Sequence, residues 1–232
     1  MYFAIIKRRR GLYIESMKKL RVLALLPVFA LIPLCACSKK VDYYSSVSEY
    51  RHDIYLYEED KMSLKIYLSE KETPYNCDGV KGEMSSVCEV YYFAENTPGE
   101  VELDLCGMGG EMSYLSVSRS FYLSFDCKES FGAKASVNLT IDGKQTTIEA
   151  NNVREEGTID GATALKCVTE YDGEQFEKLT KNGAFCGEIG IRLLYDEGCY
   201  YYVGVIDREG KTHAYLLDAS DGKIISEREL DS

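Results

Sequence analysis

Hydrophobic and polar residues alternate along most of the chain between residues 49 and 152. The alternation is clearest in residues 62–68, 101–105, 121–125 and 137–141. A period of two is typical of strands with one buried and one wet face, which is the antiparallel arrangement. Asp142-Gly143 between two alternating runs indicates a tight hairpin turn. About seven or eight such strands in about a hundred residues predict an antiparallel β-sandwich-like domain over residues 49–152.

The pattern changes after Asn151-Asn152, and residues 153–232 are predicted to form a separate α+β domain. Asp160 is suited to cap a helix that carries Ala162, Leu165 and Val168 on one face. The run Asp172–Gln175 resembles a capping box for a second helical turn, which Asn182-Gly183 is expected to end. Strand-like runs follow at residues 189–195, 200–206, 212–217 and 223–226. A helix followed by an antiparallel meander is an α+β unit, so the fold class is mainly β with an α+β C-terminal part.

An uncharged apolar stretch occupies Val22–Ala36, directly behind Lys18, Lys19 and Arg21. A basic segment followed by a short apolar segment is the layout of a secretory signal, predicted here as residues 1–36. The stretch is shorter than the roughly 20 residues that span a bilayer, although a transmembrane helix is the alternative interpretation. Met17 is the expected start of translation, the alternative being a long basic leader.

The apolar stretch ends in Leu34-Cys35-Ala36-Cys37, which resembles the lipobox of bacterial lipoproteins. That resemblance implies cleavage before Cys37, a diacylglycerol thioether on its sulfur, and acylation, for example by palmitate, of its new amine. Two or more acyl chains give stable anchoring. Residues 37–48 are then a lipidated tether. The expected location is the extracytoplasmic face of the cell membrane, in the cell envelope.

The charge balance narrows the range of partners. Residues 1–36 carry seven of the 27 basic residues and one of the 38 acidic ones, so the remainder has a net charge of about −17. Such a surface repels phosphate backbones, which argues against nucleic acid as a partner. The expected partners are the membrane, through the lipid on Cys37, and a protein, peptide or glycan ligand.

The segment Tyr200–Ser226 resembles the closing half of PepSY-like domains. It has a Tyr-rich strand, a turn, a second strand, the sequence Asp218-Ala219-Ser220-Asp221-Gly222 and a last short strand. PepSY-like modules are small exported domains, some of them attached to peptidases that they are proposed to restrain. The resemblance therefore implies a peptidase-restraining or envelope-stress role as an alternative function. The family has no catalytic residues to transfer to this chain.

Groups with catalytic potential are few. His52 and His213 are the two histidines, and no Ser has the flanking glycines of a nucleophile elbow. The cysteines after Cys37 have no C-x-x-C spacing, which argues against a zinc ribbon or a thioredoxin-like site. They are either disulfide partners, with Cys77–Cys88, Cys106–Cys127 and Cys167–Cys186 as order-based pairs, or small buried hydrophobic residues. We expect no cofactor and no metal site, and a small envelope hydrolase is the less favoured alternative.

Tyrosine is the one unusual feature of the composition, with 19 residues in the chain. Tyr91-Tyr92 and Tyr200-Tyr201-Tyr202 place at least one ring on each face of a predicted strand. These rings either pack in the sheet with their hydroxyl groups at its rim or form an aromatic binding surface. The sequence thus predicts a membrane-anchored, non-enzymatic binding module with Tyr91, Tyr92, Tyr200, Tyr201 and Tyr202 as candidate binding residues.

Overall fold

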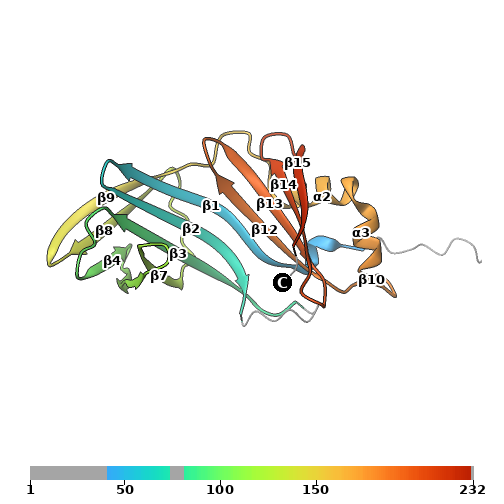
Figure 1. Cartoon of the computed structure of the whole chain (residues 1–232), viewed down its shortest axis with the longest axis horizontal. Coiled ribbons are helices and arrows are strands. Elements are labelled where there is room, and N and C mark those ends of the chain that lie inside the picture. Colours follow the sequence, from blue (N-terminus) through green and yellow to red (C-terminus); the bar gives the residue numbers. More distant parts are fainter. Residues whose placement is uncertain (1–40, 74–80, 231–232) are drawn as a thin grey trace, which may run out of the picture. The chain divides into compact units, whose positions relative to one another are not determined.

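The computed structural model describes residues 41–73 and 81–230, which form a mainly antiparallel β structure with two short helices near its C-terminal part (Figure 1). The first nine strands are β1 (Val47–Glu59), β2 (Met62–Glu72), β3 (Met84–Ala94), β4 (Val101–Leu105), β5 (Met108–Glu111), β6 (Ser113–Leu115), β7 (Ser120–Asp126), β8 (Lys134–Ile141) and β9 (Lys144–Asn152). The later elements are α2 (Gly161–Tyr171), α3 (Gly173–Lys178), β10 (Thr180–Lys181), β11 (Ala184–Phe185), β12 (Glu188–Tyr195), β13 (Cys199–Ile206), β14 (Thr212–Asp218) and β15 (Ile224–Leu230). A 3-10 turn, η2 (Tyr43–Ser46), precedes β1.

Strand β1 is the centre of one continuous sheet. The sheet runs β15-β14-β13-β12-β1-β2-β3-β7-β6, and β9, β8, β4 and β5 branch from β1 and curl back to form a near-barrel. Every pairing is antiparallel except β1 with β12, where Val47 lies opposite Ile189 and Arg51 opposite Arg192 in parallel register. A parallel pair needs a long crossover, and here the connection runs through β2–β9 and both helices.

The first hydrophobic core fills the near-barrel. Alternate residues of β2 and β3 point inward, among them Leu64, Ile66 and Val90, each of which is fully buried. Tyr55 of β1 joins them and donates its hydroxyl hydrogen bond to the carbonyl oxygen of Gly132 at 3.2 Å. Alternation along each strand therefore fills one face of the sheet with apolar side chains and leaves the other face to polar ones.

The second core lies between helix α2, helix α3 and the strands β12–β14. Leu165 and Val168 of α2 and Phe176 of α3 pack on alternate residues of β12 and β13 such as Ile191 and Val203. Both helices thus cover the sheet on the side that also faces the first core.

A bulge at His52 changes the phase of β1. Arg51 lies opposite Ser69 and Asp53 opposite Leu68 in β2, so His52 is an extra residue between them. An extra residue exchanges the two sides of a strand for every position that follows. Consequently Tyr55 enters the first core, whereas Ile54 lies beside Tyr67 on the other side of the sheet.

The predicted fold class is confirmed, as are most element positions. Asp142 and Gly143, with φ of 47° and 78°, form the predicted hairpin turn between β8 and β9. Asp160 caps α2 by accepting a hydrogen bond from the amide of Thr163 at 2.7 Å.

Two details of the helical region differ from the sequence prediction. Ala162 is exposed, and Ala164 takes its expected place in the core, because the buried stripe of α2 begins at Gly161 and continues at Ala164. Asn182-Gly183 does not end a helix, since α3 already ends at Lys178; it forms the turn of the two-stranded β10–β11 sheet, with φ of 53° and 78°.

The predicted domain boundary near residue 153 divides most residues of the first core from most residues of the second, but β1 contributes to both cores. Val41–Ser232 group into one compact unit. The predicted signal segment 1–36, the lipidation site Cys37 and residues 38–40 of the predicted tether lie outside the described residues. The rest of the tether is part of the fold, since it contains η2 and the first residues of β1, Val47 and Ser48, which are buried. Among the helices that the structure describes, none is long and apolar enough to cross a bilayer.

Candidate binding site on the open face of the sheet

One face of the sheet is turned away from the first core and from both helices, and it carries a series of cross-strand polar contacts. We call it the open face; it consists of the outward residues of β7, β3, β2, β1, β12 and β13. Lys65 of β2 and Arg192 of β12 are exposed on it, and Tyr67 and Tyr91 are half-buried. Both helices pack on the second core, on the opposite side of these strands.

Four charged side chains and the Tyr122 hydroxyl form a continuous ladder across five neighbouring strands of the open face. The Tyr122 hydroxyl donates to Glu89 at 3.2 Å, and Lys71 Nζ donates to the same carboxylate at 2.7 Å. Lys71 also lies 3.7 Å from Glu49 Oε1, while Arg192 donates to Glu49 Oε2 from Nε at 2.8 Å and from Nη2 at 2.5 Å. Cross-strand pairs of opposite charge stabilise a sheet, and here the three inner members, Glu89, Lys71 and Glu49, are each held by neighbours on both sides.

An aromatic ladder runs beside the charged one. The guanidinium carbon of Arg51 lies 4.1 Å from the ring centroid of Tyr67. The Tyr67 and Tyr91 centroids are 5.8 Å apart, and those of Tyr91 and Tyr122 are 4.9 Å apart. Burial, and then the nearby charge of Glu89, raises the pKa of the Tyr91 hydroxyl, so that this ring is neutral under ordinary conditions. The Tyr67 ring, which meets Tyr91 edge-on, contacts the Arg51 guanidinium, and this cation–π contact helps to position it.

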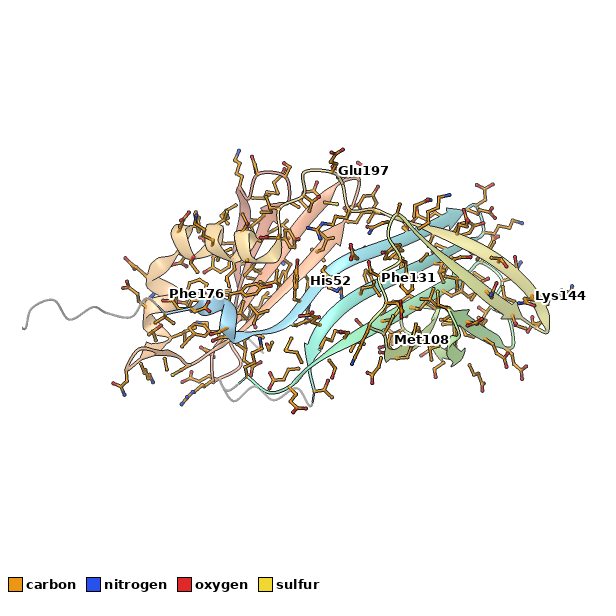
Figure 2. The ribbon with its side chains drawn as sticks, turned by 180° about the vertical axis from the view of Figure 1, so that it is seen from behind. His52, Met108, Phe131, Lys144, Phe176 and Glu197 are labelled. Atoms are coloured by element: carbon orange, nitrogen blue, oxygen red, sulfur yellow. The ribbon has the colours of Figure 1, made fainter. Side chains whose placement is uncertain are left out.

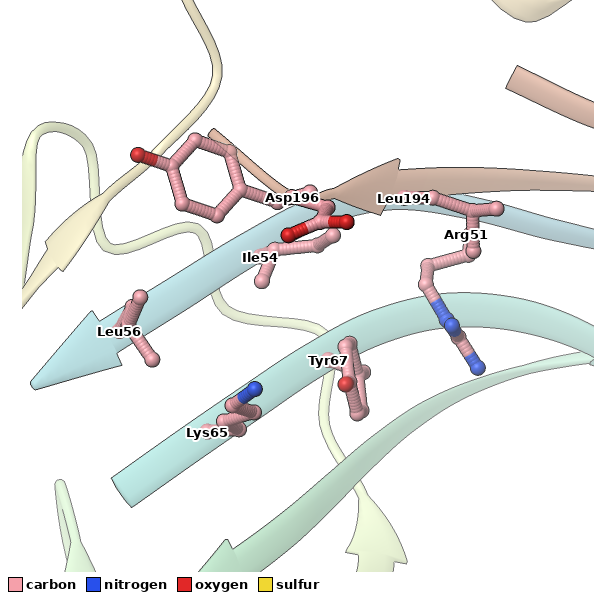
Figure 3. A pocket seen from close by; sticks show the side chains of 8 residues that line it. Arg51, Ile54, Leu56, Lys65, Tyr67, Leu194 and Asp196 are labelled. Atoms are coloured by element: carbon pink, nitrogen blue, oxygen red, sulfur yellow. The ribbon is translucent and has the colours of Figure 1, made fainter. Parts of the chain in front are cut away.

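Beyond the bulge the open face contains a pocket of about 260 Å³, which we call the β1 pocket (Figure 3). The parallel pairing of β1 with β12 ends at Arg51 and Arg192, and the space that opens next to it is floored by Ile54 and Leu56. The pocket is lined by Arg51, Ile54, Leu56, Lys65, Tyr67, Leu194, Tyr195 and Asp196. In Figure 3, Arg51 and Lys65 lie on either side of Tyr67, and Asp196 lies across the pocket from them.

The two cations of the β1 pocket differ from the cations of the ladder. Lys71 and Arg192 are bound to carboxylates, whereas Arg51 and Lys65 form no ion pair with any residue that the structure describes. The Arg51 Nε atom is also buried, without a hydrogen-bond acceptor. A buried donor that lacks a partner costs free energy.

A second hollow, of about 500 Å³, lies along the N-terminal half of β1. Gly190 and Gly204 face each other across β12 and β13 on its floor, and the Tyr202 hydroxyl group lies over Gly204. The hollow is lined by Ser48, Glu49, Lys71, Glu72, Gly190, Arg192, Tyr202, Gly204, Ile206 and Thr212. Its polar lining distinguishes it from the β1 pocket, although Glu49 and Arg51 stand only two positions apart on the same strand.

No family model matches this chain, and neither a curated protein nor a solved structure matches it.

The five predicted tyrosines are separated by the fold. Tyr91 belongs to the aromatic ladder of the open face, and Tyr202 lines the second hollow under Arg192, whose guanidinium carbon is 5.6 Å from the ring centroid. Tyr92 is buried in the first core, and Tyr201 is buried in the second core, where its hydroxyl donates to the carbonyl oxygen of Ile159 at 3.0 Å. Tyr200 lines a separate hollow near Glu197. A shared binding role for the five therefore stays a prediction.

The sequence prediction missed Arg51, Lys65 and Tyr67, the polar wall of the β1 pocket. Lys65 and Tyr67 do follow from alternation, because they are the outward residues between Leu64, Ile66 and the next core position. Arg51 could not be placed in this way, because the bulge at His52 interrupts the alternation between Arg51 and Ile54.

Neither histidine is among the residues that line the β1 pocket, and each of them pairs with an acid. His52 Nδ1 is 2.8 Å from Asp53 Oδ2, and this hydrogen bond holds the pKa of Asp53 below its usual range despite partial burial. His213 Nε2 is 3.6 Å from Glu229 Oε2 at a shallow hollow whose lining contains neither serine nor cysteine. Neither histidine is thus placed beside a candidate nucleophile in these contacts.

The six cysteines in the described part of the chain, Cys88, Cys106, Cys127, Cys167, Cys186 and Cys199, carry free thiols. The order-based pairs Cys106–Cys127 and Cys167–Cys186 are therefore not formed in this structure, and Cys77 lies outside the described residues. Burial raises the pKa of the Cys88 and Cys127 thiols, as expected for small apolar residues of the core. Within the described ranges, no group of three His, Cys, Asp or Glu residues is arranged to hold a metal ion.

Proposed function

We propose that this chain is an exported lipoprotein, anchored to the extracytoplasmic face of the cell membrane by lipid on Cys37, and that its folded body binds a protein, peptide or glycan. The lipobox-like sequence Leu34-Cys35-Ala36-Cys37 carries the first part of the proposal. The open face supports the second part, because its ladders join neighbouring strands through hydrogen bonds, ion pairs and ring contacts, and because the β1 pocket presents two cations that form no ion pair within the described ranges. Rigid, pre-positioned polar and aromatic groups reduce the entropy lost on binding.

The anchor is tested at Cys37, with Cys35 as the matched control. The full chain is expressed in a bacterium, and the N-terminal peptide of the membrane-bound form is measured by mass spectrometry. Wild type and Cys35→Ser are expected to begin at residue 37 and to carry a diacylglycerol with or without a further acyl chain. Cys37→Ser removes the sulfur atom that we propose to carry the lipid, so this variant is expected to yield unacylated protein. An uncleaved, unacylated wild-type N-terminus would refute the anchor.

A specific observation supports one alternative role, restraint of a membrane-side peptidase. Strand β13, a turn, strand β14, a turn built on Asp218 and strand β15 follow one another in the order that the PepSY-like resemblance implies. Asp218 Oδ1 accepts hydrogen bonds from the Ser220 amide and hydroxyl at 2.8 and 2.6 Å, and Gly222 has a φ of 74°. The test is to add the purified full chain to a bacterial membrane fraction and to measure peptidase activity. A dose-dependent decrease supports this role, and unchanged activity contradicts it.

A further inference from the structure

We infer that the β1 pocket binds the carboxyl terminus of a peptide whose last side chain is apolar. This inference rests on the proposed binding function and specifies its ligand. The pocket combines an apolar floor with two cations on one wall. The last residue of such a peptide carries the matching groups, an apolar side chain and a carboxylate, within a few bonds of each other.

The charges of the pocket determine the sign of the ligand. Arg51 and Lys65 flank Tyr67 and have no ion pair with a described residue, whereas Asp196 lies on the opposite wall (Figure 3). An anionic group is therefore attracted to the wall formed by β1 and β2 and repelled from the end of β12. Arg presents several N–H donors in a plane that matches a carboxylate, and the Arg51 side chain lines the pocket.

The floor of the pocket determines the character of the group beside the anion. Ile54, Leu56 and Leu194 supply aliphatic surface, and the Tyr67 and Tyr195 rings border it. Removal of apolar ligand surface from water at this floor stabilises the complex, while a charged side chain would lose its hydration there. The last side chain of the ligand is thus expected to be aliphatic or aromatic.

The dimensions and the adjoining surface favour a peptide over a fatty acid. Pockets that enclose a whole small ligand measure roughly 300–1,000 Å³, and the β1 pocket at about 260 Å³ is below that range. The larger hollow on the same face, by contrast, is lined by charged and polar groups such as Glu49, Lys71 and Arg192. A peptide places its terminal residue in the pocket and its polar backbone toward that hollow, whereas an acyl chain would have to lie against charges.

A glycan is less well matched to this face than a peptide. Sugar rings stack on exposed aromatic faces. The tyrosines of the aromatic ladder and Tyr202 are covered at least in part by protein groups, and among the rings of the β1 pocket Tyr195 is the exposed one. Arg51 lies over Tyr67, Tyr91 contacts both Tyr67 and Tyr122, and Arg192 lies over Tyr202.

The experiment measures the binding of acetylated pentapeptides to the full chain in a mild detergent by isothermal titration calorimetry. The probes are Gly-Gly-Ser-Gly-Leu and Gly-Gly-Ser-Gly-Phe with a free carboxyl terminus, the same two peptides as C-terminal amides, and Gly-Gly-Ser-Gly-Lys with a free terminus. Decanoate is included as an acyl-chain probe. The Leu or Phe peptide with a free carboxyl terminus is expected to bind at least about tenfold more tightly than its amide, because the amide cannot form the charge-assisted hydrogen bond of the carboxylate. It is also expected to bind more tightly than the Lys peptide and decanoate.

Three variants assign the effect to the pocket. Arg51→Gln and Lys65→Gln are each expected to weaken binding of the free peptide several-fold and to leave binding of the amide nearly unchanged. Lys144→Gln, at the exposed turn between β8 and β9 (Figure 2), makes the same charge change away from the pocket and is expected to bind like wild type. Circular dichroism melting curves of each variant establish that it is folded.

The inference is overturned if free and amidated peptides bind equally, if decanoate binds more tightly than the peptides, or if no probe binds at millimolar concentration. None of these results bears on the anchor, which is measured by the mass of the N-terminal peptide. Equal binding of free and amidated peptides would overturn the carboxylate specificity alone and would leave a peptide-binding module in place.

Discussion

At the scale of single residues, Glu49 holds the open face together. Its carboxylate lies between two cations, Lys71 from β2 and Arg192 from β12, and its side chain is only 13% exposed. Lys71 also forms an ion pair with Glu89, which it would keep if Glu49 were lost. The loss of Glu49 would therefore change the electrostatic environment of Arg192 more than that of Lys71. Removal of one carboxylate from a half-buried ladder reduces the compensation for the desolvation of the cations that it contacts.

We predict that Glu49→Gln lowers the free energy of unfolding by about 1–2 kcal/mol, a value reduced from the buried-pair range because Arg192 is partly exposed. Glu149→Gln is the matched control, since Glu149 pairs with Lys134 while both side chains are more than half exposed. This control is expected to change stability by less than about 0.5 kcal/mol. Urea unfolding of both variants measures the difference. Equal effects of the two substitutions would show that the ladder contributes no more than a surface ion pair.

At the scale of secondary-structure elements, the hairpins and helix starts could be predicted because their signals are local. Asp142-Gly143 and Asp160 act on residues within three positions of themselves, and the structure uses both as the sequence indicates. The branching of β1 toward both β12 and β9 could not be predicted, because alternation does not specify which strands pair. The β1 pocket was missed for the same reason, since it depends on where β12 leaves β1 and on the bulge at His52.

The β8–β9 turn provides a test of these local rules. Gly143 has a φ of 78° and open space where a Cβ would stand, so that Gly143→Ala would be strained by its backbone alone. We predict a loss of about 1–2 kcal/mol in the free energy of unfolding for this variant. Gly173→Ala, at the first position of α3, also meets open space but has an ordinary φ, and it is expected to be neutral or to stabilise by up to about 1 kcal/mol. Thermal unfolding would contradict this account if the two variants changed stability alike.

At the scale of the whole described body, β1 links the two cores. Val47 and Ile54 pack with the second core, whereas Tyr55 packs with the first, and the same strand pairs with β2, β9 and β12. The sequence prediction of two domains with a boundary near residue 153 separates most core residues but does not include a strand shared between them. A shared strand couples the two cores, because neither can lose β1 without exposing apolar surface in the other.

We predict that the two cores unfold as one cooperative unit. Leu193→Ala removes a fully buried side chain from the second core and is expected to cost about 2–5 kcal/mol. Hydrogen exchange monitored by mass spectrometry should then show reduced protection in β3, in the first core, as well as in β13. A loss of protection confined to β12–β15 and the helices would contradict the coupling and support two independent domains.

The bulge at His52 also has a consequence for how this chain tolerates evolutionary change. Side-chain parity along a strand has the same property as a reading frame: the removal of one residue between Arg51 and Ile54 would turn Tyr55 toward solvent and Ile54 toward the barrel interior. Replacement of His52 by another polar residue leaves that frame intact. Related chains are therefore expected to vary in residue type at this position while conserving the number of residues between the two halves of β1.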